Sequence, residues 1–243
     1  MSTPYEANTV SYADGMIREV LIIGGSSSIG RAFASAATMR FGRVTGTFSR
    51  RIPSTTVTGV NWVHLDIRSQ ESVEHLLEVC PAERLSAVYY FPGYLVESPT
   101  SPPSLDDLTE SLQVNVGGLI QVFERMASRV PPGCRMVGIS SRSALKPSFD
   151  VAYAAGKAAQ LGAARSLATK FPQVCFYLVA PTTIRDSRMF LSMPEVVRMR
   201  HEQRLRGDML SPADFADVLL TLDELSDDDL RNRLFTVGVE EEP

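Results

Sequence analysis

The sequence of 243 residues predicts one α/β domain, a single doubly wound, mostly parallel sheet with helices on both of its faces. Short, almost continuously apolar runs alternate along the chain with helical segments. Such runs are typical of strands buried on both faces, and a helix that joins two parallel strands makes a right-handed crossover. No internal repeat interrupts the alternation, and the length allows one sizeable core.

The expected elements follow one another in a regular order. Strands are expected at residues 19–23, 44–48, 61–65, 87–91, 134–139, 175–180 and 234–237. Helices are expected at 28–40, 69–79, 104–129, 151–170, 194–206 and 211–222. Residues 1–16 are a polar tail before a single domain at 17–243, and residues 98–104, with three prolines, are a surface loop. The long irregular segment at 182–193 is expected to open a substrate lid at about 182–210.

The composition argues against several classes of partner. The net charge of -4, with both signs mixed, gives no basic field for nucleic acid. Cys80, Cys134 and Cys175 are far apart and mostly in apolar surroundings, so we expect neither a disulfide framework nor a metal site. The first residues lack a secretory signal, and no apolar run approaches the roughly 20 residues of a membrane span. We therefore expect a cytoplasmic protein without a membrane partner.

A glycine-rich turn, GGSSSIG at 24–30, directly follows the first expected strand and leads into a helix. Backbone N–H groups in such a turn can approach a pyrophosphate, and the helix N-terminus adds a favourable partial charge. The alternative is a tight turn whose small residues only allow close packing. The place after the first strand favours a dinucleotide, and the cofactor-binding residues predicted here are Gly24, Ser26, Ser27, Ser28, Ile29 and Gly30.

The end of the second strand bears on the choice of dinucleotide. It has no carboxylate where NAD-binding proteins hold the ribose hydroxyls. Ser49 and Arg50 can instead bind a 2′-phosphate, which favours NADP, and a solvated basic turn is the alternative. Asp66, followed by Ile67 after the third strand, is expected to accept a hydrogen bond from the adenine amino group. Capping of the next helix is a rival role for this region, although Ser69 suits it better.

Tyr153 and Lys157 are four residues apart in an expected helix, so their side chains share a face. A free tyrosine has a pKa of about 10, and a neighbouring ammonium favours the phenolate and lowers that pKa. The pair is therefore able to move protons. An exposed side-chain contact is the alternative, because this spacing occurs by chance in many helices.

Further features stand in register with this pair over nearly the whole chain. The first turn carries Gly24 and Gly30, a middle helix carries Asn115, and Ser141 follows the fifth strand twelve residues before Tyr153. With Tyr153-x-x-x-Lys157, this order resembles the short-chain dehydrogenase/reductase family, whose members have a Rossmann fold. Among them the chain looks like a divergent, 3-oxoacyl-reductase-like member.

The resemblance implies a catalytic set of Asn115, Ser141, Tyr153 and Lys157. Tyr153 would protonate a carbonyl oxygen as hydride arrives, and Lys157 would lower its pKa and hold the nicotinamide ribose. Ser141, rather than the adjacent Ser140, would hydrogen-bond the substrate oxygen. Asn115 would anchor a water that relays protons from Lys157.

The resemblance also implies cofactor contacts from Gly93, Tyr153, Lys157 and the backbone of Ile184. Three positions depart from the family pattern. Ser28 replaces the middle glycine of the turn, Pro92 removes a backbone donor, and Thr182 follows Pro181 where relatives have glycine. These departures suggest an altered approach to the pyrophosphate and an unusual wall beside the substrate.

We therefore expect an NADPH-dependent oxidoreductase that reduces a ketone or 3-oxoacyl-type carbonyl to a secondary alcohol. The arginines of the lid suit an acyl or anionic substrate, but they do not all share one helical face, and a solvated basic helix is the favoured interpretation. The alternatives are a non-catalytic nucleotide-binding sensor or partner-binding protein, and an isomerase or dehydratase that uses the cofactor transiently. A homodimer or homotetramer is implied by the resemblance.

Overall fold

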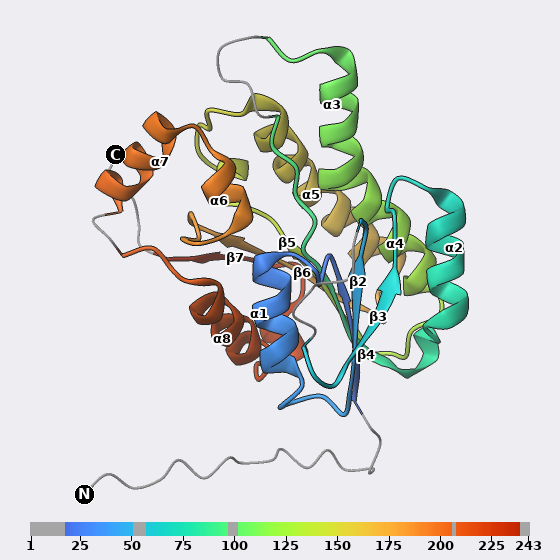
Figure 1. Cartoon of the computed structure of the whole chain (residues 1–243). Helices are drawn as coiled ribbons and strands as arrows, with labels where there is room; N and C mark the ends of the chain where they lie inside the picture. Colours follow the sequence, from blue (N-terminus) through green and yellow to red (C-terminus); the bar gives the residue numbers. More distant parts are fainter. Residues whose placement is uncertain (1–17, 51–56, 97–101, 206–207, 239–243) are drawn as a thin grey trace, which may run out of the picture.

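The computed structural model describes residues 18–50, 57–96, 102–205 and 208–238. Within them, seven parallel strands form one sheet in the order β3-β2-β1-β4-β5-β6-β7 (Figure 1). The strands are β1 Glu19–Ile23, β2 Arg43–Phe48, β3 Val60–His64, β4 Leu85–Tyr90, β5 Arg135–Ile139, β6 Cys175–Pro181 and β7 Leu234–Val237. The predicted doubly wound α/β sheet is confirmed, and every pairing in it is parallel.

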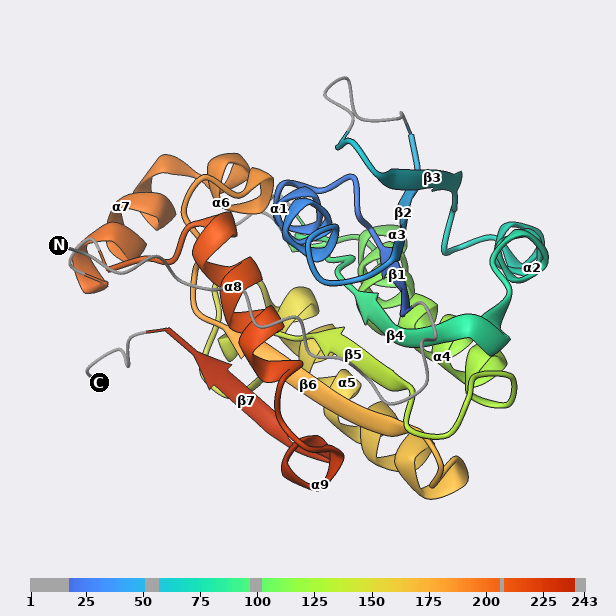
Figure 2. The ribbon, with the colours of Figure 1, turned by 90° about the horizontal axis from the view of Figure 1, so that it is seen from below.

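Helices cover both faces of this sheet (Figure 2). They are α1 Ser28–Ala37, α2 Gln70–Val79, α3 Leu105–Leu112, α4 Gly118–Ala127, α5 Val151–Lys170, α6 Arg188–Ser192, α7 Glu195–Arg204, α8 Pro212–Leu222 and α9 Asp227–Leu230. Helices α1 and α8 lie on one face, and α2, α4 and α5 lie on the other. Each face therefore has its own buried apolar cluster.

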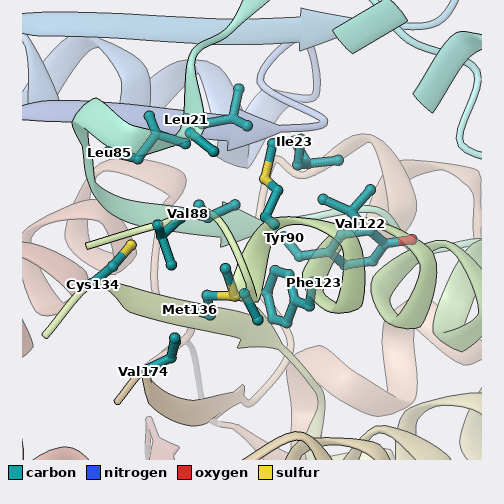
Figure 3. Close-up of a cluster of buried hydrophobic side chains, with 14 of the residues drawn as sticks. Leu21, Ile23, Leu85, Val88, Tyr90, Val122, Phe123, Cys134, Met136 and Val174 are labelled. Atoms are coloured by element: carbon teal, nitrogen blue, oxygen red, sulfur yellow. The ribbon is translucent and has the colours of Figure 1, made fainter. Parts of the chain in front are cut away.

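The alternation of side chains along β1 joins the two clusters. Leu21 and Ile23 pack toward α2, α4 and α5 (Figure 3), whereas Val20 and Ile22 pack toward α1 and α8. This is the two-residue period of a strand with both faces buried. Because β1 is fixed on both sides, the glycine turn that follows it has a defined place at the edge of the sheet.

That place is the point where the strand order reverses. β1 lies between β2 and β4: the chain continues from β1 to β2 and β3 on one side and then crosses to β4 on the other side of β1. In open parallel sheets a crevice forms at the carboxyl ends of the strands beside such a reversal. The turn after β1 and the loop after β4 meet there, since a Cβ at Gly24 would lie 3.2 Å from the Pro92 ring.

Two predicted elements need correction. The helix expected at 104–129 is divided, because α3 ends at Leu112 and a π-helical turn, Gln113–Gly117, leads into α4. Apolar periodicity marks the faces of a helix but does not reveal one extra residue in a turn. The segment 182–193, expected to be irregular, contains α6, whose first turn is capped by the Ser187 hydroxyl accepting from the Phe190 N–H at 3.1 Å.

The other predicted elements are present, but many of their ends differ from the prediction by one to three residues, as at α1, which ends at Ala37 rather than at residue 40. Helix α5 has the expected bounds, and Ser69 caps α2 by accepting from the Ser72 N–H at 3.2 Å. The predicted tail at 1–16, part of the predicted loop at 98–104 and Arg206 lie outside the described residues. In the described ranges, no helix has both the length and the apolar character needed to cross a bilayer.

Candidate active site

A cavity of about 1530 Å³ follows the carboxyl ends of the strands. The turn after β1, the ends of β2 and β3, the loops after β4, β5 and β6, and helices α5 to α7 contribute to its wall. Most of the predicted site residues line it: Gly24, Ser26, Ser27, Ser28, Ile29, Ser49, Arg50, Asp66, Ile67, Gly93, Ser141, Tyr153, Lys157 and Ile184. Two others, Gly30 and Asn115, are buried behind this wall.

The glycine turn is held close to the sheet. Gly24 has φ +75°, a conformation that side chains with a Cβ rarely adopt, and its N–H donates to Thr47 Oγ1 at 2.9 Å. Ser27 caps α1 by accepting from the Gly30 N–H at 2.9 Å. A Cβ at Gly30 would collide with the Gly24 carbonyl. The lack of a side chain at Gly30 therefore allows the first turn of α1 to pack closely against the glycine turn. The tight turn at a helix N-terminus fits a pyrophosphate.

Ser28 connects this turn to helix α6. Its Oγ accepts a hydrogen bond from the Arg188 N–H at 3.0 Å, at the start of α6. The serine that stands where the family pattern has glycine thus bonds the turn to the start of α6.

Where the end of β3 borders the cavity, the Arg68 guanidinium binds the carboxylate of Asp66. Two guanidinium nitrogens lie 3.0 Å from the Asp66 oxygens, and a third lies 2.7 Å from Glu110 Oε1. The hydrogen bond from Arg68 lowers the pKa of Asp66, although burial opposes it. Arg31 and Thr47 line the cavity beside Ser49 and Arg50, and neither residue was among those predicted from the sequence.

Tyr153 and Lys157 both face this cavity from α5, and both are buried. The Lys157 Nζ donates to the Ile139 carbonyl at 2.7 Å and to the Pro92 carbonyl at 3.1 Å. It lies 5.6 Å from the centre of the Tyr153 ring. The exposed contact considered as the alternative is therefore excluded, because the two side chains are not on the surface.

The predicted lowering of the Tyr153 pKa by Lys157 is wrong for the chain by itself. Burial raises the pKa of Tyr153 to about 12, and a hydrogen bond with Ser141 opposes that rise. Burial likewise lowers the pKa of Lys157 to about 7. The reason is physical: each side chain loses the hydration of its charged form, and the amine bonds to two carbonyls rather than to the phenol.

The two adjacent serines after β5 have different partners. Ser140 is buried, and its hydroxyl donates to the Lys157 carbonyl at 3.1 Å. The Ser141 hydroxyl bonds to Tyr153 and accepts from the Ser143 N–H at 3.1 Å. Of the pair, Ser141 is the one whose oxygen faces the phenol.

Asn115 sits in the π-helical turn and binds the loop after β4. Its Oδ1 accepts from the Tyr94 N–H at 3.1 Å, and its Nδ2 donates to the Tyr94 carbonyl at 2.9 Å and to Ser111 Oγ at 3.0 Å. Its side chain therefore fixes the loop that carries Gly93. A proton-relay role stays a prediction.

Asp150 is a supporting residue that the sequence analysis missed. Its Oδ1 caps α5 by accepting from the Tyr153 N–H at 2.8 Å, and its Oδ2 accepts from the Val96 N–H at 2.7 Å. An aspartate before an apolar helix start was the available signal. The carboxylate sets where the helix begins and thus where the phenol lies.

The basic helix α7 borders the cavity. Val197, Arg200, His201 and Arg204 line it, and their spacing marks one face of α7. His201 Nδ1 lies 2.9 Å from Thr183 Oγ1, which ties α7 to the loop after β6. Arg200 and Arg204 are exposed although they border the cavity, which agrees with the favoured interpretation of a solvated basic helix.

Comparison with known proteins identifies the family of the chain. Residues 24–228 match a family model described as Enoyl-(Acyl carrier protein) reductase. The chain is 26% identical over 232 residues to "Short chain dehydrogenase ausX" of Aspergillus calidoustus, with 85% of this chain and 90% of that protein covered.

Solved structures agree on the fold. A dehydrogenase/reductase from Sinorhizobium meliloti 1021 has TM-score 0.81 and 19% identity, covering 90% of this chain and 93% of that one. BdcA in complex with NADPH has TM-score 0.80 and 22% identity, covering 94% and 97%.

A parallel α/β fold with a glycine turn at its switch point and a tyrosine and lysine in its cavity defines a class of nucleotide-dependent oxidoreductases. The chain belongs to the short-chain dehydrogenase/reductase family, which acts on small molecules with a nicotinamide cofactor.

Proposed function

We propose that this protein is an NADPH-dependent reductase that converts a ketone or a 3-oxoacyl-type carbonyl to a secondary alcohol. The observation that carries this proposal is one continuous cavity, lined at one part by the glycine turn and Arg50 and at another by Ser141, Tyr153 and Lys157. A cofactor bound along it would present its reactive ring to the phenol.

The dinucleotide would supply the hydride, and the protein supplies position and protons. The Tyr153 phenol, whose pKa is raised by burial, is protonated at neutral pH and is thus ready to donate to the carbonyl oxygen. The Ser141 hydroxyl, bonded to that phenol, stabilises the charge that develops on the same oxygen. Lys157 borders the cavity beside Tyr153, where its amine would hold the nicotinamide ribose.

The preference for NADPH over NADH is supported by charge. Ser49 and Arg50 follow β2, where a 2′-phosphate would lie, and Arg31 lines the same wall. The nearby carboxylates, Asp66 and Glu110, are both bonded to Arg68. A phosphate there meets guanidinium groups rather than an unpaired acid.

An acyl or anionic substrate is supported by the other end of the cavity. Apolar side chains there include Leu95, Phe149, Met189, Phe190 and Met193, and basic ones include Arg142, Lys146, Arg200 and Arg204. Among the described lining residues, the acidic ones are the pair held by Arg68. We infer a carbonyl compound with an apolar body and a carboxylate or phosphate.

The remaining proposals concern the state of the protein. The cysteines Cys80, Cys134 and Cys175 are buried and free, which supports a reducing compartment such as the cytoplasm. A homodimer or homotetramer is proposed from family membership alone.

The test is NADPH oxidation with a panel of ketones, oxo acids, their esters and acyl thioesters. Net consumption of NADPH with formation of the alcohol supports the proposal. Tight NADPH binding without turnover of any carbonyl supports the non-catalytic alternative, and product formation without net consumption supports an isomerase or dehydratase.

A further inference from the structure

Gln160 is a fully buried amide close to the proposed catalytic pair. It lies on α5, three residues after Lys157, and none of its surface is exposed. Its Nε2 donates to the Asn115 carbonyl at 2.6 Å, while its Oε1 has no hydrogen-bond partner in the described part of the chain. A buried amide with one unpaired atom costs stability. The presence of this amide in the core therefore needs an explanation, and its one hydrogen bond, from Nε2 to the Asn115 carbonyl, is the place to look for it.

The acceptor of this hydrogen bond lies in an irregular turn. Asn115 is in the middle of the π-helical turn Gln113–Gly117, where the Gly118 N–H bonds to the Gln113 carbonyl, five residues back. Such a turn holds one more residue than an α-turn and frees a backbone carbonyl for a partner outside the helix. The Gln160 amide provides that partner from the neighbouring helix.

The connection continues from Asn115 to Lys157. The Asn115 side chain bonds to both the N–H and the carbonyl of Tyr94. Two residues earlier, the Pro92 carbonyl accepts from the Lys157 Nζ at 3.1 Å. Because Lys157 and Gln160 are one turn apart on α5, these bonds form a closed ring from helix to π-turn to loop and back.

The segments joined by this closed ring of hydrogen bonds are tightly packed against each other. A Cβ at Gly156 would lie 2.7 Å from the Asn115 Cβ, so α5 and the π-turn are in close backbone contact beside Gln160. A change in the Gln160 bond is therefore passed to Asn115 and the loop rather than absorbed by a gap.

We propose that Gln160 is a positioning residue for the reaction, whose amide N–H holds the Asn115 turn and through it the loop that binds the Lys157 amine. This inference rests on the proposed carbonyl reduction. Gln160 does not line the cavity, so it acts through Asn115 and Lys157 and touches neither cofactor nor substrate.

The test replaces the amide by apolar side chains of similar volume, Gln160→Met and Gln160→Leu. The expected result is a fall in kcat of about ten- to a hundredfold, the size of effect that a small misplacement of reacting groups produces. The pH profile of kcat should shift as well, while the Kd for NADPH changes by less than about threefold, since Gln160 lies behind the wall.

A matched control is Gln121→Met on α4, because Gln121 Oε1 is also buried without a partner and the residue lies off the cavity. The control should keep the kcat and pH profile of the wild type. Wild-type kcat and pH profile in both Gln160 variants would overturn the inference, as would a lower melting temperature with unchanged kinetics, the sign of a purely structural role. If the wild type reduces no carbonyl, the proposed function fails instead.

Discussion

The Nζ of Lys157 lies 5.6 Å from the centre of the Tyr153 ring, within the range of a cation–π contact, while its hydrogen bonds go to the carbonyls of Ile139 and Pro92. The amine is therefore fixed by the backbone at the end of β5 and by that of the loop after β4. That arrangement holds the amine beside the phenol in a buried site. The loss of hydration raises the pKa of Tyr153 and lowers the pKa of Lys157, and both shifts favour the neutral form of the side chain.

Burial of Lys157 predicts a specific dependence of stability on pH. Its pKa is about 7 in the folded chain and 10.5 in the free side chain. Below both values the folded state carries the full penalty of a buried charge. Between them the unfolded chain binds more protons, so stability rises with pH.

Lys157→Met should therefore gain stability relative to the wild type near pH 6 and lose that advantage toward pH 10. Thermal unfolding of both proteins across this range measures it. Lys170→Met, at the exposed end of the same helix, serves as the control and should show no such trend. A pH-independent difference for Lys157→Met would contradict the buried amine.

The choice of cofactor depends on Arg50. Arg50→Ala should weaken NADPH binding by roughly 10- to 100-fold, because a hydrogen bond to a charged group contributes about 1.5–3 kcal/mol. NADH binding should stay within about twofold. Calorimetric titration measures both affinities, and Arg40→Ala, which removes a surface partner of Glu224 outside the cavity, is the control. Equal affinities of the wild type for NADPH and NADH would contradict the assignment.

The anionic substrate depends on the basic wall. Arg142→Gln and Arg200→Gln should raise the KM for a linear oxo acid about tenfold and leave that for its methyl ester nearly unchanged. Arg198→Gln is a matched control on α7, because its guanidinium donates to the Leu191 carbonyl at 3.2 Å and lies outside the cavity wall. A wild type that prefers the ester would show that the basic residues serve solubility alone.

Asp150 stabilises the protein through two hydrogen bonds, one to the start of α5 and one to the loop after β4. Asp150→Ala removes the cap of α5 and leaves the Val96 N–H without its acceptor, so we expect a loss of about 2 kcal/mol in unfolding free energy. Ser226→Ala, the cap of the short exposed helix α9, should cost less than about 1 kcal/mol. Denaturant unfolding measures both, and equal losses would show that the second acceptor bond contributes nothing.

Much of this protein was predictable from sequence for clear physical reasons. Buried strands such as β1 are apolar throughout, and the four-residue spacing of Tyr153 and Lys157 fixes a shared helical face. The glycine turn was found because close backbone approach restricts the residue type at Gly24 and Gly30.

What sequence could not supply depends on contacts between distant segments. The π-turn at Asn115 adds one residue to a helix without disturbing its apolar face. The partners of Lys157 are backbone carbonyls, which every sequence has, so spacing could not reveal them. The pKa direction of Tyr153 was missed because burial of the pair, rather than its spacing, decides it.

The central claim is that Tyr153 donates the proton in a carbonyl reduction, and Tyr153→Phe tests it most directly. The change removes one oxygen and leaves the ring, so NADPH should bind with nearly the wild-type Kd. Single-turnover oxidation of bound NADPH by a carbonyl substrate that the wild type reduces should slow by about 10²- to 10⁴-fold. A variant that oxidises NADPH at the wild-type rate on that substrate would contradict the account.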